Sequence, residues 1–212
     1  MKLAQKRQGK SASRRREIIQ AALACFTERG FTETTMADIR RRSRASTGSI
    51  YHHFKSKEHL AAEIYLEGIR DYQVGLLKAL EEQESACDGI YAVIAYHLRW
   101  VEAHPDWTQF LFQNRHAEFM DSTEEEFARM NAEFLQRCSP WFLRHINAGT
   151  VRSISPDLYL SILLGPCMEF TRLYVAGRPC TPLDRAIHEL ASAAWRSLRT
   201  DTPRKGMNHE DP

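Results

Sequence analysis

Histidines, carboxylates and cysteines are the residues of this sequence that could perform acid–base, metal or redox chemistry. Pairs such as His116 with Glu118 and His97 with Glu102 have no recognised metal or catalytic spacing. There is also no His-Glu-x-x-His run, no phosphate-binding glycine loop and no serine in a nucleophile elbow. We therefore expect no catalytic residues, no cofactor and no metal, and an enzyme built in the C-terminal part stays only an alternative.

The cysteines are odd in number and widely spaced, and they lack the paired spacing that a zinc site uses. Reduced thiols in a reducing compartment fit this pattern best. A redox- or metal-responsive protein remains an alternative, with Cys138 paired to Cys167 or Cys180, or with a histidine cluster as the sensor. The full set is Cys25, Cys87, Cys138, Cys167 and Cys180.

Recognition of nucleic acid is the chemistry that the N-terminal region favours. Residues 1–60 hold fourteen Lys and Arg against five Asp and Glu, about +9 net, whereas residues 61–212 hold fifteen against twenty-two, about −7. Basic side chains attract phosphate because neutralising it releases counterions. The two regions are therefore expected to face different partners.

Small polar residues stand where a recognition helix would begin. Ser46 can cap a helix that continues through Gly48 and Ile50 to Phe54. A recognition helix needs small and polar residues at the end that enters a major groove about 12 Å wide. Glycine permits close approach of the backbone, and the hydroxyl groups can bond phosphates or bases.

Two helices must position that segment, and a long one must follow it. Apolar residues at helical spacing predict a helix over 14–29 that Gly30 ends, and Thr34 and Thr35 predict the start of a second, short helix. Residues 43–46 are long enough only for a tight turn. A long fourth helix is expected to start near Glu58 and to connect the N-terminal region to the rest of the chain.

The remaining chain also shows helical spacing and no strand alternation, so the fold class is all-α. Pro156 and Pro182 lie where prolines open helices. No apolar run is long enough to span a bilayer, because residues 158–175 are interrupted by charged residues, glycine and proline. No cleavable targeting segment is apparent near the N-terminus, so we expect a soluble, cytoplasmic protein without a membrane partner.

The run Thr-Gly-Ser-Ile-Tyr-His-His-Phe-Lys-Ser-Lys-Glu-His-Leu, from Thr47 to Leu60, resembles the signature of TetR-family regulators. The resemblance extends back through the first helix, the threonine pair and the Met-Ala-Asp-Ile run at 36–39. It implies a three-helix head with a helix-turn-helix, followed by a larger helical bundle. The DNA-binding positions that it and the local chemistry indicate are Thr35, Arg44, Ser46, Thr47, Gly48, Ser49, Tyr51, His52 and Lys55.

One position departs from the family pattern, whose turn usually holds glycine followed by a β-branched residue. Arg44 and Ala45 stand there instead. If the backbone φ is positive at this point, arginine costs about 1 kcal/mol relative to glycine. The hypothesis is that Arg44 recovers part of this through a phosphate contact.

A ligand pocket is expected in the bundle, where aromatic and hydrogen-bonding side chains are dense. Apolar walls with a few polar groups suit a small, mostly apolar or aromatic effector. Aromatic residues at helical spacing are, however, more often part of an ordinary core. The candidate lining residues are His97, Trp100, Trp107, Phe110, Asn114, His116, Phe134, Trp141 and Glu169.

A homodimer is expected, because two heads spaced by a two-fold axis match a palindromic operator in double-stranded DNA. The last two helices are the candidates for pairing, although their apolar stripes could also be internal core. The residues indicated are Leu160, Leu164, Leu173, Leu183, Ile187, Leu190, Ala194 and Leu198.

The sequence thus predicts a ligand-responsive transcriptional regulator, a repressor that binds its operator as a dimer and is released by a small molecule. The expected organisation is a flexible basic leader over 1–13, a DNA-binding domain over 14–60, a ligand-binding and dimerisation domain over 61–200 and a flexible tail over 201–212.

Overall fold

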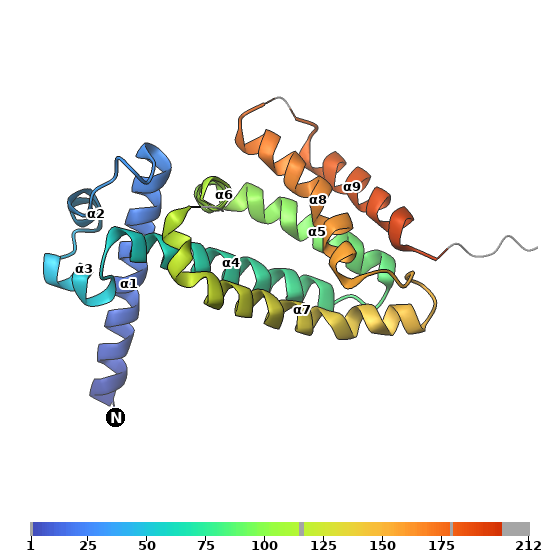
Figure 1. Cartoon of the computed structure of the whole chain (residues 1–212), viewed down its shortest axis with the longest axis horizontal. Helices are drawn as coiled ribbons and strands as arrows, with labels where there is room; N and C mark the ends of the chain where they lie inside the picture. The colour runs from blue at the N-terminus through green and yellow to red at the C-terminus, as the bar shows by residue number, and fades with distance from the viewer. Residues whose placement is uncertain (1, 115–116, 179, 201–212) are drawn as a thin grey trace, which may run out of the picture.

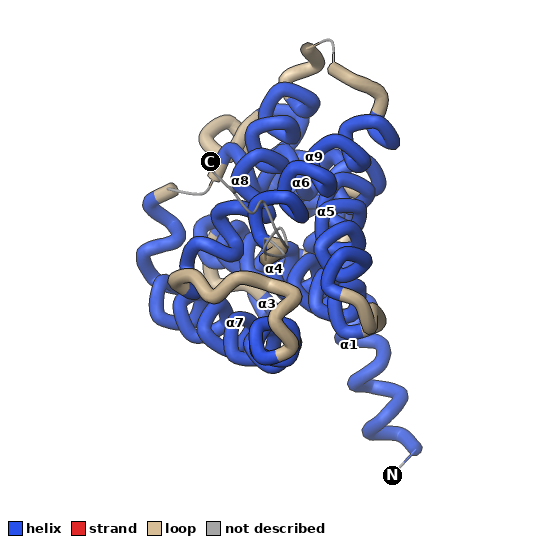
Figure 2. The backbone as a smooth tube through the Cα atoms, turned by 90° about the vertical axis from the view of Figure 1, so that its right-hand side faces the viewer, coloured by secondary structure: helices blue, strands red, loops and turns tan. Residues whose placement is uncertain are grey.

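The computed structural model describes residues 2–114, 117–178 and 180–200 of the chain. Over these residues the fold is all-α, as the sequence predicted, with nine α-helices and one short 3-10 helix. Figure 1 shows a head made of α1, α2 and α3 at one end, and α4 running from this head along the body. The view from the side in Figure 2 shows the body helices stacked around α4 and α5.

The first helix, α1, spans Lys2–Arg29 and is longer than expected. The apolar spacing predicted a helix that starts near Arg14, after a flexible leader over residues 1–13. The predicted start of the helix was wrong. Lysine, arginine, glutamine, leucine and alanine dominate this segment and all favour helix, and it contains no proline. Gly30 ends the helix with a φ of +82°, a conformation in which glycine avoids a side-chain clash.

The helix-turn-helix consists of α2 (Met36–Ser43) and α3 (Thr47–His53). Thr35 caps α2 through a capping box, accepting from the Asp38 amide while Asp38 accepts from the Thr35 amide. Ser46 caps α3 by accepting from the Ser49 amide at 3.1 Å. The turn between them passes through Arg44, whose φ of +53° confirms the left-handed conformation anticipated there.

Helix α4 (Lys57–Glu81) joins the head to the body. Arg15 of α1 donates to Glu63 at 2.6 Å and to Glu67, which fixes α1 against the first turns of α4. Lys57 reaches back to the carbonyl oxygens of Phe31 and Thr32 at 2.9 and 3.2 Å. Its ammonium group is therefore part of the scaffold.

The body is completed by five further α-helices and the 3-10 helix, all connected by short loops. Pro156 opens α8 as predicted, whereas Pro182 lies just before α9 as its N-cap residue. The elements are α5 (Ala86–Ala103), α6 (Pro105–Gln113), η1 (Glu118–Thr123), α7 (Glu124–Asn147), α8 (Pro156–Val175) and α9 (Leu183–Leu198).

Two hydrophobic cores meet at α4 and α5, where Tyr72 and Tyr96 pack against both. The head core extends beyond the first 60 residues, because Trp100, Phe110 and Phe119 of the body are packed into it. Phe110 of α6 stacks on Phe26 of α1. The second core fills the far end of the body between α4, α5, α7, α8 and α9. The recognition head is thus held by contacts with α4 and α6 as well as by its own helices.

Two observations complete the description of the fold. The one strand-like contact in the described ranges is an isolated bridge between Val151 and Arg199, which ties the end of α9 to the α7–α8 loop. Within those same ranges, none of the helices combines the length and the apolar character needed to cross a membrane.

Candidate DNA-binding face and ligand cavity

Helix α3 is buried on one side and open on the other. Ile50 and Phe54 are sealed into the head core, and this confirms the expectation that Phe54 is a core residue. On the opposite side, Thr47, Gly48 and His52 are exposed, and Tyr51 leaves 53% of its surface open to solvent. A recognition helix must expose polar side chains on one side while its other side packs in the head. Helix α3 meets both requirements for insertion into a DNA groove.

Helix α2 contributes one side chain to this face that the sequence reading did not select. Arg40 donates to the Thr47 hydroxyl at 3.3 Å, so a guanidinium lies beside the first turn of α3. Both residues border a groove of about 270 Å³ between the two helices, together with Met36 and Tyr51. The signal was available, because arginines 40–42 lie opposite the apolar side of α2 in the sequence pattern.

Two of the predicted DNA-binding residues, Thr35 and Lys55, have different surroundings. The Thr35 hydroxyl is engaged within the capping box, donating to the Asp38 carboxylate at 2.6 Å. This bond and the Thr35 amide lower the pKa of Asp38, so the carboxylate remains charged. Lys55 is exposed, while its backbone amide donates to His59 Nδ1 at 3.1 Å.

Arg44 differs from the arginines around it. Arg41 pairs with Asp38, and Arg42 pairs with Glu28 at 2.6 Å. Arg44 is exposed, and in the described part of the chain no carboxylate lies within ion-pairing distance of it. Its charge is therefore available to a phosphate.

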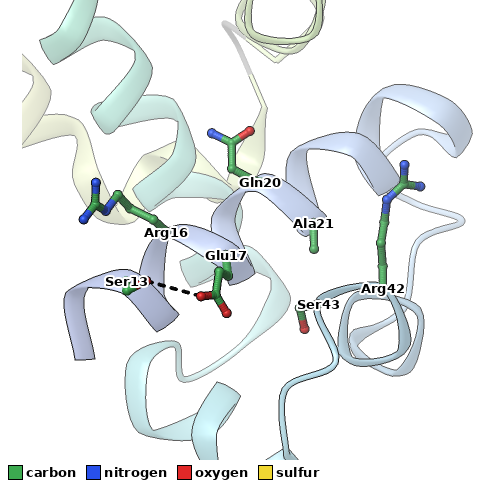
Figure 3. Close-up of a pocket in the computed structure, with 7 residues that line it drawn as sticks. All are labelled: Ser13, Arg16, Glu17, Gln20, Ala21, Arg42 and Ser43. Carbon is green, nitrogen blue, oxygen red and sulfur yellow. Dashed lines mark hydrogen bonds between the residues drawn. The ribbon is translucent and has the colours of Figure 1, made fainter. Parts of the chain in front are cut away.

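An open groove of about 640 Å³ also runs between α1 and α2 on the head (Figure 3). Glu17 accepts from Ser13 at 3.3 Å and from Arg14 at 2.6 Å, so its charge is balanced locally. In Figure 3 the Arg16 and Arg42 side chains point away from each other, so they do not converge on one point. This groove is consequently a solvated surface beside the helix-turn-helix and not an anion site.

The body contains a partly open cavity of about 460 Å³. It lies between five helices, and its wall is mainly apolar and aromatic, as expected for a small-molecule site. The lining side chains are Tyr65, Ile69, Tyr72, Gln73, His97, Trp100, Val101, Thr108, Leu111, Phe112, Phe127, Asn131, Phe134, Leu135, Leu160, Leu164 and Met168.

The polar groups of this cavity are hydrogen-bonded to one another. The Tyr72 hydroxyl lies 2.8 Å from His97 Nδ1, and His97 Nε2 lies 3.1 Å from the Thr171 hydroxyl. Gln73 donates to the Asn131 side-chain oxygen at 2.7 Å. Burial lowers the pKa of His97 to about 4, so the imidazole is uncharged near neutral pH.

Three of the nine predicted pocket residues, His97, Trp100 and Phe134, line this cavity. Four others belong to packing or capping: Phe110 to the head core, Trp141 to the far core, Trp107 to the contact with Gly68 and Asn114 to the end of α6. Glu169 is exposed and pairs with Arg172 at 2.6 Å. His116 lies outside the described residues.

The predicted and observed lining residues differ because of which face each helix turns toward the cavity. Aromatic density in the sequence does not show which side of α6 faces the cavity, and the structure turns Thr108, Leu111 and Phe112 toward it and Phe110 toward α1. The α4 residues Tyr72 and Gln73 were missed because the long fourth helix was read as a connector. Their recurrence with Tyr65 and Ile69 at helical spacing was the available signal.

The residues proposed for dimerisation divide into three groups. Ile187, Ala194 and Leu198 are buried inside the protomer, so their side chains belong mainly to its own core, although Ala194 also borders the groove between α8 and α9. The stripe near heptad spacing on α9 faces α5 and the far core. Leu160 and Leu164 line the cavity. The others are half-buried, with Leu173 on α8 and both Leu183 and Leu190 on α9.

A different strip faces outward between α8 and α9. It borders a groove of about 230 Å³ and includes Ile162, Pro166, Leu190, Ala193 and Ser197. Pro166, Ala193 and Ser197 are exposed. These small residues leave the backbones of the two helices open to close approach.

Four of the cysteines, Cys25, Cys87, Cys138 and Cys167, show no sign of activation. Burial raises the pKa of Cys138 to about 11 and that of Cys167 to about 12, and it raises the pKa values of Cys25 and Cys87 as well. Protonated thiols are poor nucleophiles and poor metal ligands. Over the described residues, no three His, Cys, Asp or Glu side chains gather in a way that could hold a metal ion.

A helix-turn-helix with an exposed second helix, set on a larger helical body, defines the chain as a DNA-binding transcription regulator. Residues 18–64 match the model of the bacterial regulatory proteins of the tetR family. This segment is therefore a DNA-binding head of the TetR-family type, as the resemblance of the first 60 residues implied. Most of the residues that fill the head core, and the exposed α3 residues, lie within this segment.

Two named relatives are similar in sequence to this chain over most of its length. KstR2 of Mycobacterium tuberculosis, an HTH-type transcriptional repressor, is 28% identical over 181 residues, which cover 82% of this chain and 87% of that protein. YhgD of Bacillus subtilis, an HTH-type transcriptional regulator without a characterised role, is 23% identical over 166 residues, with coverage of 78% and 83%.

Solved structures confirm the fold. A TetR-family transcription regulator from Marinobacter aquaeolei superposes with a TM-score of 0.74 at 14% identity, covering 92% of this chain and 100% of that one. The ketosteroid transcriptional regulator KstR2 of M. tuberculosis gives a TM-score of 0.66 at 22% identity, covering 89% and 96%. At these identities the likeness concerns the fold alone.

Proposed function

We propose that this protein is a transcriptional repressor that binds a palindromic operator as a homodimer and is released by a small, mostly apolar molecule held in the body cavity. The observation that carries the proposal is the presence, in one packed unit, of an exposed recognition helix and a mainly apolar cavity. The repressor role is supported by the name of KstR2, which resembles this chain over most of its length.

DNA contact is assigned to the exposed side of α3 and its surroundings. Thr47, Gly48, Tyr51 and His52 would meet base edges or phosphates, because they are the outward residues of the reading helix. Arg44 and Lys55 would neutralise phosphates at the two ends of α3. Arg40 joins this set because it lies against Thr47.

Ligand and DNA would be coupled through α4 and α6. Three successive turns of α4 line the cavity, while its first turns pack in the head core. Helix α6 presents Leu111 and Phe112 to the cavity and Phe110 to Phe26 of α1. A ligand that prefers a different placement of these helices would change the spacing of the two heads and weaken operator binding.

Dimerisation is assigned to the outward strip between α8 and α9. A two-fold pairing there would bring the small residues Ala193 and Ser197 of two copies together in a four-helix arrangement. Pairing would also place the two heads at a fixed distance, which an operator with two half-sites requires.

The alternative of a thiol or metal sensor on this scaffold is not favoured by the raised cysteine pKa values. Thiol titration and metal analysis of the purified protein test it directly. Equal operator affinity before and after mild oxidation is the expected result.

The proposed function is tested by selecting bound duplexes from a random pool and footprinting the result. A palindromic site protected in two half-sites is expected. The variant Gly48→Ala is the sharp comparison, because in the free protein a methyl group there meets nothing within 4 Å. It should fold normally and bind the selected site at least tenfold more weakly if the α3 backbone approaches DNA closely. Recovery of no common sequence would contradict the proposal.

A further inference from the structure

Three side chains from three helices form one hydrogen-bonded row at the cavity wall. Tyr72 of α4 lies 2.8 Å from His97 Nδ1 on α5, and His97 Nε2 lies 3.1 Å from the Thr171 hydroxyl on α8. Thr171 is completely buried and His97 is 6% exposed. Tyr72 and His97 line the cavity itself, so this row ends at the space where an effector would bind.

The hydrogen bonds of the row must all run in one direction. An uncharged imidazole carries one N–H donor and one bare nitrogen acceptor. Burial keeps His97 in this uncharged form at neutral pH. If one of its nitrogens accepts from a neighbour, the other must donate to the neighbour on its far side.

The direction of these hydrogen bonds follows from the surroundings of Thr171. A fully buried hydroxyl group needs an acceptor for its hydrogen. Thr108 meets this need through the carbonyl oxygen of His104, one helical turn earlier, at 2.9 Å. Among the hydrogen bonds of the described residues, Thr171 has no such carbonyl partner for its hydroxyl, and its one acceptor is His97 Nε2.

It follows that Thr171 donates to Nε2 and that the imidazole proton resides on Nδ1. Nδ1–H then donates to the Tyr72 oxygen. The hydrogen of the Tyr72 hydroxyl is left without an acceptor among the hydrogen bonds found in the described chain, where its one recorded partner is His97. The adjoining cavity is where an acceptor would be placed.

We propose that the Tyr72 hydroxyl is the hydrogen-bond donor that recognises the effector, and that the effector is an uncharged, mostly apolar compound carrying a carbonyl-type oxygen. This inference rests on the proposed function for its biological meaning, since it names the chemical class held by the same cavity. His97 and Thr171 act as positioning residues that hold Tyr72 as a donor.

The remaining lining residues fit an uncharged molecule. No Asp, Glu, Lys or Arg stands among the described side chains that line the cavity. A carboxylate or ammonium ligand would lose its hydration there without gaining an opposite charge, which is strongly unfavourable. Gln73 and Asn131 pair at another part of the wall and keep one amide oxygen and one amide nitrogen available for a second polar group.

The tautomer of His97 provides a test that needs no ligand. ¹⁵N spectra of protein labelled at histidine separate protonated from bare ring nitrogens, and His97→Gln identifies the signals of this residue. A proton on Nδ1 is expected, and Thr171→Val should shift the equilibrium toward the other tautomer. A wild-type imidazole protonated at Nε2 would overturn the direction of the row.

Binding of matched bicyclic probes tests the donor itself. The ketone 2-decalone, the hydrocarbon decalin and the carboxylate of decahydro-2-naphthoic acid differ mainly in the polar group, and quenching of Trp100 fluorescence follows their binding. Tyr72→Phe should weaken 2-decalone binding about fivefold to tenfold, the ratio for one neutral hydrogen bond, and leave decalin unchanged. The carboxylate should bind the wild type at least tenfold more weakly than the ketone.

Each other outcome counts against the inference. Equal loss for ketone and hydrocarbon in Tyr72→Phe would show that the ring of Tyr72 only packs, and binding of none of the probes would exclude uncharged bicyclic compounds from the cavity. Because no DNA is present, failure of operator binding leaves these measurements intact. Release from the operator by a charged compound only would overturn this inference while supporting the proposed function.

Discussion

Phe110 of α6 stacks on Phe26 of α1 with ring centroids 5.6 Å apart and planes inclined by 19°. This contact joins a helix that lines the ligand cavity to the helix that carries the recognition head. Both rings are almost completely buried. Head and body are therefore expected to unfold together, and a change in α6 is expected to reach the head.

Removing the Phe110 ring should be costly for the whole protein. Phe110→Ala leaves a cavity at the junction and should lower the free energy of unfolding by about 3–5 kcal/mol. Chemical denaturation followed by both circular dichroism and tryptophan fluorescence should show one transition for each protein. Phe112→Ala is the matched control, because this half-buried ring faces the cavity and should cost clearly less. Equal losses for the two variants would contradict a special role for the junction.

Arg44 combines a strained backbone with an unpaired charge. Arg44→Gly should raise the free energy of unfolding by about 1 kcal/mol, because glycine adopts the observed φ of +53° without a side-chain clash. The same change should reduce the slope of log affinity against log salt by about one phosphate contact. Arg129→Gln, on α7 far from the head in sequence, is the control and should change neither quantity. An unaltered slope in Arg44→Gly would rule out the phosphate contact.

A charged side chain in the outward strip between α8 and α9 is expected to disrupt the dimer. Ala193→Glu places a charge at an exposed position beside Ile162 and Leu190, so the protomer should fold normally while the dimer dissociates. Sedimentation velocity at micromolar concentration should show a monomer, and operator affinity should fall by at least tenfold. Ala132→Glu, at an exposed position of α7, should stay dimeric. A dimeric Ala193→Glu protein would place the interface elsewhere.

The buried His97 is expected to make the free energy of unfolding fall as the pH falls. Because burial lowers its pKa to about 4, the unfolded chain binds a proton near pH 6.5 while the folded chain does not. Stability is thus lost as the pH falls from about 6.5 to about 4, by about 3 kcal/mol from this residue. The unfolding free energy of wild type minus that of His97→Gln should decrease by this amount over that range. A constant difference would show that His97 titrates normally.

The head was largely predictable from the sequence, because its signals are local. Thr35 and Ser46 fix the starts of two helices through their own side chains, and the turn between them leaves room for little else. The N-terminal extension of α1 was not anticipated, since a basic segment without a clear apolar stripe resembles an unstructured leader.

The body was predictable as helices but not as a site. Which face of a helix turns inward depends on neighbours far away in sequence. Trp141 was predicted to line the pocket but lies in the far core, and Leu160 was predicted for dimerisation but lines the cavity. The row from Tyr72 through His97 to Thr171 joins residues that are 25 and 74 positions apart. No spacing rule within one element could have revealed it.

The central claim is that this protein selects an operator as a dimer. The most direct test titrates purified protein onto a labelled duplex from the region flanking its own gene, and onto a scrambled duplex, at two salt concentrations, by fluorescence anisotropy. We predict binding to the first duplex at a stoichiometry of whole dimers, at least a hundredfold tighter than to the scrambled duplex and weakened by salt. Equal, weak binding to both duplexes would contradict the claim and leave the basic head as a nonspecific surface.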